Sequence, residues 1–213
     1  YSRNRDRIQH DYEQIKSKGI QCISIENSFY PDTLKYLYDP PVILYILGSL
    51  PKADEWMIAL IGASQCSSYG RQVSRMLARG MAAAGLTVVS GMARGSDSAA
   101  HWGALQENGR TFAVLGCGVD ICYPRENMDL YTEISRNGGI ISELPPGTRP
   151  EGYQFPRRNR IIAALARGIV VTEAKQKSGT LITVEHGLNL GKEIFAVPGR
   201  IDDALSEGCN QLI

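Results

Sequence analysis

The chain has 213 residues, of which 43% are hydrophobic and 21% are charged, and its formal net charge at pH 7 is +1. This composition is typical of a globular protein with a sizeable core, and it excludes a disordered chain. The balanced charge excludes a surface that is basic throughout, so any contact with nucleic acid must depend on basic groups that are gathered locally. The longest apolar runs are too short to span a bilayer, and no signal peptide is visible. We therefore expect a cytoplasmic protein with no membrane partner.

Residues 1–50 differ in pattern from the rest of the chain. Residues 3–18 are polar with apolar side chains near helical spacing, which predicts a helix that Gly19 ends. An alternating stretch at 20–25 and an apolar run at 42–47 predict two strands. We interpret this segment as an N-terminal extension that packs on a larger core.

From Trp56 onward, short apolar runs alternate with amphipathic stretches. Most of the apolar runs are followed by glycine or serine, and the amphipathic stretches carry apolar residues at helical spacing. The predicted strands are 57–61, 86–89, 111–115, 139–142, 169–172 and 193–197. The predicted helices are 71–84, 98–107, 127–136, 159–166 and 181–190.

This alternation of continuous apolar strands with helices predicts a parallel sheet that is covered on both faces. With right-handed crossovers, the result is a doubly wound, Rossmann-like α/β fold with a mostly parallel sheet. We interpret residues 51–213 as this core and expect further segments of the protein at both ends. The proline-containing stretch 142–155 is predicted to be a long loop, a kind of segment that is often functional.

Cysteine usage indicates reduced thiols. The chain has five cysteines, an odd number, and no two of them form a CxxC pair. Neither a zinc site nor a disulfide framework fits this spacing, and reduced thiols are typical of the cytosol. Cys117 stands between glycines in an apolar stretch and is expected to be a small buried side chain. We predict no metal site and no cofactor.

The residues that follow the predicted strands are rich in glycine, serine and arginine, as at 62–70, 90–97 and 116–118. In an open parallel sheet, ligands bind beyond the carboxyl ends of the strands. Glycines expose backbone N–H groups there, and helix N-termini attract anions. One glycine after a strand is more often only a tight turn, but several such ends side by side predict an anion pocket. The chain has neither a P-loop nor a true GxGxxG motif.

The densest basic cluster is the segment 155–160, which contains three arginines and an asparagine at a predicted helix start. Guanidinium groups fit phosphate contacts, although the charge pattern fits a solvated helix end equally well. Phe155 and Tyr153 could stack on bases. For Phe155, a role as a core anchor is the default interpretation.

The sequence contains no convincing set of catalytic residues. His101 is expected to be a packing or surface residue of its helix, and Asp97 is expected to cap the same helix. Glu143 and Glu173 stand at strand ends, where carboxylates could transfer protons but could also cap helices or pair with arginines. We predict no catalytic residue and no enzymatic activity.

Taken together, the loops resemble the DprA/Smf family of DNA-processing proteins. The resemblance covers nearly the whole chain, and the combination of motifs in this order is highly specific. The matching stretches are Tyr30-Pro31, DPP at 39–41, VVSGMARGSDSAAH at 88–101, AVLGCGVD at 113–120, YPREN at 123–127, Ser142-Glu143, FPRRNRII at 155–162, EAK at 173–175, SGTLIT at 178–183 and FAVPG at 195–199.

The resemblance implies a protein that binds single-stranded DNA, protects incoming DNA and helps to load RecA in natural transformation and recombination. It also implies an extended Rossmann core that forms a homodimer, and in many members an N-terminal helical domain and a C-terminal winged-helix-like domain. Carried over by position, the residues that bind DNA phosphates would be Gly62, Ser64, Gly91, Arg94, Arg125, Arg158, Asn159, Arg160, Lys175, Ser178, Gly179 and Thr180.

The sequence departs from the family pattern at Ser64. Members of the family usually carry Gly-Ser-Arg or Gly-Ala-Arg after the first core strand, and that arginine is a principal phosphate contact. Here the residues are Gly62-Ala63-Ser64, so a hydroxyl replaces the charge. We expect weaker or less salt-sensitive binding, because each lost phosphate contact lowers the salt dependence.

Two alternatives remain open. The first is a hydrolase of nucleotide phosphates similar to the LOG and lysine-decarboxylase-like proteins, whose glycine-threonine turn precedes a catalytic glutamate. The corresponding turn here is 177–180 with Glu185 five residues on, a partial match. The second is an assembly protein whose loops only hold a dimer or a RecA contact, which is compatible with DNA binding.

Overall fold

The computed structural model describes residue 9 and residues 12–213. Residues 12–17 are helical, and the earlier part of the helix predicted at 3–18 lies, apart from residue 9, outside the described residues. The strands are β1 (Ile20–Ser24), β2 (Ile43–Gly48), β3 (Met57–Ile61), β4 (Thr87–Ser90), β5 (Thr111–Val114), β6 (Gly138–Ser142), β7 (Gly168–Val171) and β8 (Glu193–Ala196). The helices are α2 (Ser68–Ala83), α3 (Ser96–Gln106), α4 (Met128–Asn137), α5 (Gln154–Leu165), α6 (Gly179–Asn189) and α7 (Glu207–Asn210), with short 3₁₀ turns η1 (Asp32–Tyr36) and η2 (Arg125–Asn127).

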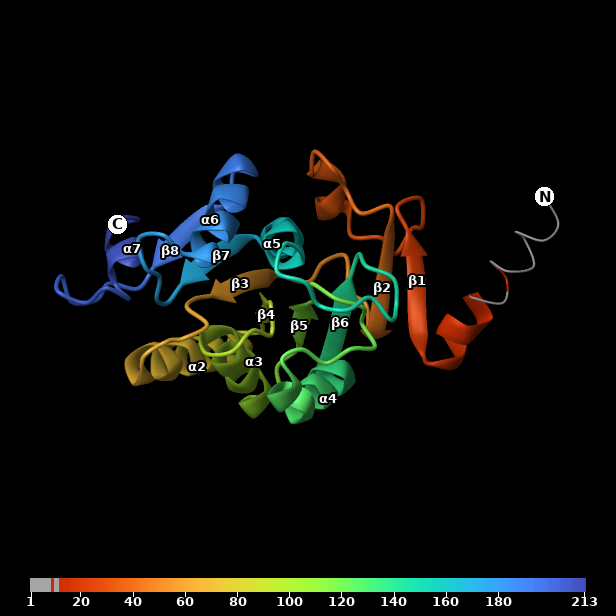
Figure 1. Cartoon of the computed structure of the whole chain (residues 1–213), viewed down its shortest axis with the longest axis horizontal. Coiled ribbons are helices and arrows are strands. Elements are labelled where there is room, and N and C mark those ends of the chain that lie inside the picture. Colours follow the sequence, from red (N-terminus) through yellow and green to blue (C-terminus); the bar gives the residue numbers. More distant parts are fainter. Residues whose placement is uncertain (1–8, 10–11) are drawn as a thin grey trace.

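All eight strands described form one sheet in the order β1-β2-β6-β5-β4-β3-β7-β8. Strands β3 to β8 pair in parallel. Helices α2, α3 and α4 cover one face, and α5 and α6 cover the other (Figure 1). The prediction of a doubly wound, Rossmann-like α/β fold with a mostly parallel sheet is confirmed.

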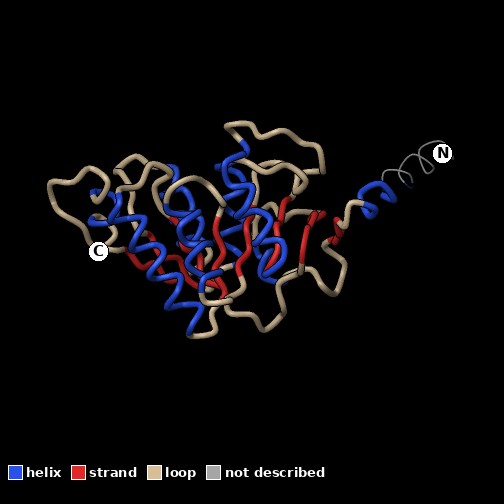
Figure 2. The backbone as a smooth tube through the Cα atoms, turned by 90° about the horizontal axis from the view of Figure 1, so that it is seen from below, coloured by secondary structure: helices blue, strands red, loops and turns tan. Residues whose placement is uncertain are grey.

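The N-terminal strands extend the same sheet. β2 pairs antiparallel with β6, where Tyr45 lies opposite Ser142, and β1 pairs antiparallel with β2. In Figure 2 the strands lie in one continuous row with helices around them. The side chains of Leu34 and Leu44 are fully buried in the same cluster as Phe112 of β5. The extension therefore shares its hydrophobic core with the rest of the chain.

The central strands have no polar face. Every residue of β4, β5, β6 and β7 is buried, as expected for parallel strands that are covered by helices on both sides. This burial explains why the strands read in the sequence as continuous apolar runs rather than as alternating ones. No helix among the described residues combines the length and the hydropathy that a bilayer crossing requires.

Four helices begin earlier than the sequence pattern predicts, and two of them, α2 and α5, by three residues or more. α5 begins at Gln154 rather than at residue 159, because Pro156 is tolerated in the first turn, where a backbone N–H is not needed. α2 begins at Ser68 rather than at residue 71, because the Ser67 side chain caps it by accepting a hydrogen bond from the Gly70 N–H at 3.0 Å. The predicted loop 142–155 is accordingly shorter.

Candidate functional site

A cleft of about 400 Å³ opens at the carboxyl end of the parallel strands. The chain leaves β3 toward one face of the sheet and leaves the neighbouring β7 toward the other face, which is the point where open α/β sheets bind ligands. Loops after β3, β4, β5 and β7 and the first turns of α5 form its walls. The residues that line it are Ile61, Gly62, Ser64, Gln65, Gly91, Ala93, Arg94, Asp97, Tyr123, Pro124, Phe155, Pro156, Arg158, Asn159, Ile162, Ser178, Gly179, Thr180 and Thr183.

Two glycines are required where the cleft meets the strands. A Cβ atom at Gly62 would lie 2.5 Å from the hydroxyl oxygens of Ser96 and Thr172, and one at Gly91 would lie 2.6 Å from the Arg158 guanidinium. Only a residue without a side chain fits these two positions. The glycines allow the strand ends to pack closely against these side chains at the base of the cleft.

Helix N-termini point at the cleft and give it a positive potential. Ser178 caps α6, and its side chain accepts a hydrogen bond from the Thr180 N–H at 3.2 Å. The Thr180 hydroxyl donates to the Gly62 carbonyl at 3.1 Å, which ties this turn to the end of β3. α5 also begins at the wall of the cleft. Unpaired N–H groups and helix dipoles attract anions without adding to the net charge.

Arg158 is a buried cation beneath the cleft. Its guanidinium donates to the carbonyl oxygens of Gly91, at 2.9 Å, and Val114, and so joins the ends of β4 and β5. Burial lowers the pKa of Arg158, whereas the nearby Asp97 carboxylate raises it. Arg158 is one of the predicted phosphate contacts, but backbone carbonyls already hold its guanidinium.

Asp97 does not cap α3 as predicted. The helix begins at Ser96, so Asp97 lies inside its first turn, and its carboxylate accepts from the N–H groups of Gly91 at 3.1 Å and Ala93 at 3.3 Å. Burial raises the pKa of Asp97, and the charge of Arg158 opposes that shift. Asp97 therefore holds the loop after β4 in place.

The rim of the cleft is polar. The Arg94 guanidinium donates to both carboxylate oxygens of Glu126 through Nε and Nη2, and both side chains are more than half exposed. Ser64 lies exposed at the same rim. A ligand with a negative charge would compete with Glu126 for the Arg94 guanidinium, because an exposed ion pair is worth little.

An aromatic pair forms one wall. The rings of Tyr123 and Phe155 stack with their centroids 5.4 Å apart and an interplanar angle of 24°. Phe155 is half-buried and lines the cleft. It is therefore more than the core anchor that the default interpretation makes it. Tyr153 is exposed outside the lining. The sequence pattern did not predict Tyr123 as a partner of Phe155, although its place in the loop after β5 was a usable signal.

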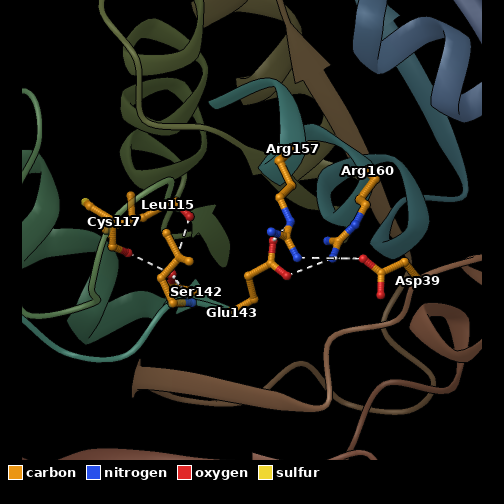
Figure 3. Close-up of polar contacts among 8 residues, drawn as sticks. Asp39, Leu115, Cys117, Ser142, Glu143, Arg157 and Arg160 are labelled. Atoms are coloured by element: carbon orange, nitrogen blue, oxygen red, sulfur yellow. Dashed lines mark hydrogen bonds and ion pairs between the residues drawn. The ribbon is translucent and has the colours of Figure 1, made fainter. Parts of the chain in front are cut away.

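The arginines of the segment 155–160 do not act as one cluster. Successive helix residues point about 100° apart, so Arg157 is exposed while Arg158 and Arg160 are buried on different sides of α5. Figure 3 shows Arg157 and Arg160 directed at Glu143 and Asp39. The Arg160 guanidinium lies 2.7 Å from Glu143 and 3.8 Å from Asp39.

Three predicted site residues lie outside the cleft lining. Arg160 is bound in its ion pair with Glu143, and the exposed side chains of Arg125 and Lys175 belong to η2 and to the loop after β7. The structure gathers the other nine around one cavity. They are Gly62, Ser64, Gly91, Arg94, Arg158, Asn159, Ser178, Gly179 and Thr180.

The candidate acid–base residues have structural partners. Glu173 is buried and accepts from the backbone N–H of Ser67 at 2.8 Å, next to the start of α2. His101 is fully buried, with its Nδ1 2.7 Å from the Thr111 hydroxyl, in keeping with the packing role expected for it. Glu185, which the hydrolase alternative requires, is exposed on α6 outside the cleft lining.

The fold and the cleft define a class of protein, a Rossmann-like domain with a polar cleft at the switch point of its sheet. The family model of DNA recombination-mediator protein A matches residues 21–213. The chain belongs to this family. The DprA/Smf resemblance seen in the motifs is thereby confirmed.

Individual relatives agree with this membership. The chain is 43% identical over 190 residues to the DNA processing protein DprA of Streptococcus pneumoniae, covering 89% of this chain and 67% of that protein. It is 40% identical over 200 residues to the protein Smf of Escherichia coli, covering 93% of this chain and 54% of that one. The chain thus spans between about half and two thirds of the length of these relatives.

Solved structures show the same fold. The X-ray structure of DprA from Streptococcus pneumoniae matches with a TM-score of 0.86 at 42% identity, over 91% of this chain and 68% of that one. DprA from Helicobacter pylori, studied for its single-stranded DNA binding mode, matches with a TM-score of 0.81 at 33% identity, over 90% of this chain and 86% of that one. A molybdenum cofactor binding protein from Rippkaea orientalis shares the fold alone, with a TM-score of 0.53 at 16% identity, over 70% of this chain and 80% of that one. The fold itself therefore does not determine the ligand.

Proposed function

We propose that this chain binds single-stranded DNA in the cleft at the carboxyl end of its sheet. The observation that carries the proposal is the aromatic pair Tyr123 and Phe155 facing a glycine backbone and a helix N-terminus across one cavity. An unpaired base can stack on the exposed ring of Tyr123, and the phosphate of the same nucleotide can accept hydrogen bonds from backbone N–H groups. Membership in the DNA recombination-mediator protein A family supports the same ligand.

The proposed contacts fall into two groups. Gly62, Gly91, Asn159 and the turn 178–180 would hold the phosphate inside the cleft, with Arg158 supplying positive charge from below. The exposed side chains of Arg94, Arg125 and Lys175 would contact phosphates that lie outside it. We assign Arg160 to fixing α5 rather than to a phosphate, because Glu143 and Asp39 already face its guanidinium.

We also propose that the function is binding and not catalysis. Among the described residues that line the cleft, Asp97 is the one carboxylate, and two backbone N–H groups already bind it. A role in protecting DNA and loading RecA, and a homodimer as the active form, are part of this proposal on the ground of family membership. A pull-down with purified RecA and a mass measurement in solution test these two points.

Fluorescence titration of the protein with a labelled oligonucleotide across a salt series tests DNA binding. We expect saturable binding at low salt that weakens as salt rises. Tyr123→Leu should weaken binding by about 1–3 kcal/mol because it removes a stacking ring. Tyr36→Leu, which removes an exposed ring from η1 outside the cleft lining, should leave binding unchanged.

No measurable binding at low salt would overturn the proposal. Equal losses in the two variants would show that the ring of Tyr123 does not contact a base. Incubation with nucleoside monophosphates, followed by a search for released base, tests the hydrolase alternative. We expect no release.

A further inference from the structure

The exposed face of α2 carries a stripe of arginines. Arg71, Arg75 and Arg79 are spaced four residues apart and are exposed. At about 100° per residue they lie within roughly 80° of arc, about 6 Å apart along the helix axis. Arg79 pairs with Glu107, whereas Arg71 and Arg75 have no ion pair and no side-chain hydrogen bond with a described residue.

Helix stability does not account for this stripe. α2 contains three arginines and no acidic residue, in a chain whose net charge is only +1. Arg71 lies one turn from the N-terminus of α2, where the helix dipole favours acidic side chains and disfavours basic ones. The four-residue spacing also sets like charges beside each other, which destabilises an isolated helix. The stripe thus concentrates positive charge on one face of α2 although this arrangement lowers the stability of the helix.

α2 begins close to the cleft. It follows the loop of Ser64 and Gln65, which line the cleft, and it runs away from the carboxyl end of β3 on the face of the sheet that α2, α3 and α4 cover (Figure 1). Further along, a shallow groove passes Arg75, the exposed Met76 and the small residue Gly80.

We propose that the outer face of α2 is a second nucleic-acid surface, which carries the single strand onward after it leaves the cleft. The inference deepens the proposed function and rests on it. Arg71 and Arg75 would each bind a phosphate of that strand. A flexible strand can follow such a track because it needs only evenly spaced charge.

Titrations with two oligonucleotides separate the track from the cleft. One should fill the cleft only, at about 4 nucleotides, and the other should extend well past it, at about 16. The variant Arg71→Gln/Arg75→Gln removes two charges from an exposed helix face. The matched control, Lys16→Gln/Lys52→Gln, removes two exposed charges from the segment before β1 and from the loop before β3, both outside α2 and outside the cleft lining.

For the long oligonucleotide, the arginine variant should bind about 10-fold more weakly, and the slope of log K against log salt should fall by about 1.4. Its affinity for the short oligonucleotide should change less than about 2-fold, and the lysine control should match the parent chain with both. Equal losses with the two lengths, or no loss with the long one, would overturn the track while leaving the cleft intact. No loss with the long oligonucleotide would point to an acidic protein as the partner of α2. If the parent chain bound neither oligonucleotide, both proposals would fall together.

Discussion

Residue 64 carries a hydroxyl where the family resemblance leads one to expect a guanidinium. Ser64 is exposed at the rim of the cleft, so a longer side chain has room to extend over the cavity. Ser64→Arg should strengthen binding of single-stranded DNA and raise the slope of log K against log salt by about 0.7, which is the contribution of one added phosphate contact.

Ser64→Gln is the control, because it adds a side chain of similar reach without a charge. Titrations of both variants over a salt series measure the difference. A slope for Ser64→Arg equal to that of Ser64→Gln would mean that no phosphate passes this rim.

The arginine run at 157–160 shows what a sequence pattern cannot predict at this scale. The arginines are neighbours in sequence, but the direction of each side chain depends on which face α5 packs against the sheet. In the packed helix Arg158 lies under the cleft and Arg160 faces Glu143. The strand-end positions Gly62 and Gly91 were predictable, because their place follows from strand polarity and not from the packing of a helix.

At the scale of an element, α5 is attached to the loop after β6 by the buried pair of Arg160 and Glu143. Their side chains are only 10% and 12% exposed, and Nη1 of Arg160 has no hydrogen-bond partner among the described residues. Glu143→Gln removes the charge that balances Arg160, so it should lower the free energy of unfolding by about 2–3 kcal/mol.

Asp39→Asn is the matched control, because Asp39 faces the same guanidinium at 3.8 Å but is 68% exposed. Its loss should cost less than about 1 kcal/mol. Urea unfolding followed by circular dichroism measures both variants. Similar losses in the two would mean that the Glu143 pair is no stronger than a surface contact.

Helix α3 contains a buried base that makes the fold sensitive to acid. Burial, together with a smaller effect from the charge of Arg158, lowers the pKa of His101 to about 3. The ordinary pKa of histidine is about 6.5, so between these two values the unfolded chain binds a proton that the folded chain does not. The His101 contribution should therefore lower the free energy of unfolding by about 1.4 kcal/mol per pH unit as pH falls below about 6.5.

His101→Asn isolates this contribution, since its amide N–H can still donate to Thr111 but does not titrate over this range. Unfolding free energies from pH 7 to pH 4 should fall less steeply in the variant than in the parent chain. Parallel pH profiles would show that His101 is not the group responsible.

Element types were predictable because the buried parallel strands lack a polar face and the helices keep the 3.6-residue period. Helix starts were not, because they depend on a cap such as Ser67 or on a proline such as Pro156 that a helix tolerates in its first turn. The stacking of Tyr123 on Phe155 depends on how two loops distant in sequence meet. No local pattern carries that information.

At the scale of the whole molecule, the division into an extension at 1–50 and a core at 51–213 raises the question of whether the two parts fold separately. We propose that they fold as one unit. β2 pairs with β6 of the core, and Leu44 of β2 is fully buried in a cluster that also contains Phe112 of β5. Losing the extension would expose an apolar face and a strand edge at the same time.

Leu44→Ala tests this cooperativity. The substitution leaves a cavity in the extension and should cost about 2–5 kcal/mol. Both tryptophans, Trp56 and Trp102, lie in the segment 51–213, so their fluorescence reports the core. If the parts unfold together, the urea midpoint seen by tryptophan fluorescence falls in Leu44→Ala and stays unchanged in Val42→Ala, whose side chain is exposed. An unchanged midpoint in Leu44→Ala would mean that the core is stable without its extension. Destabilisation of a segment that unfolds independently would not change the fluorescence of tryptophans in the core.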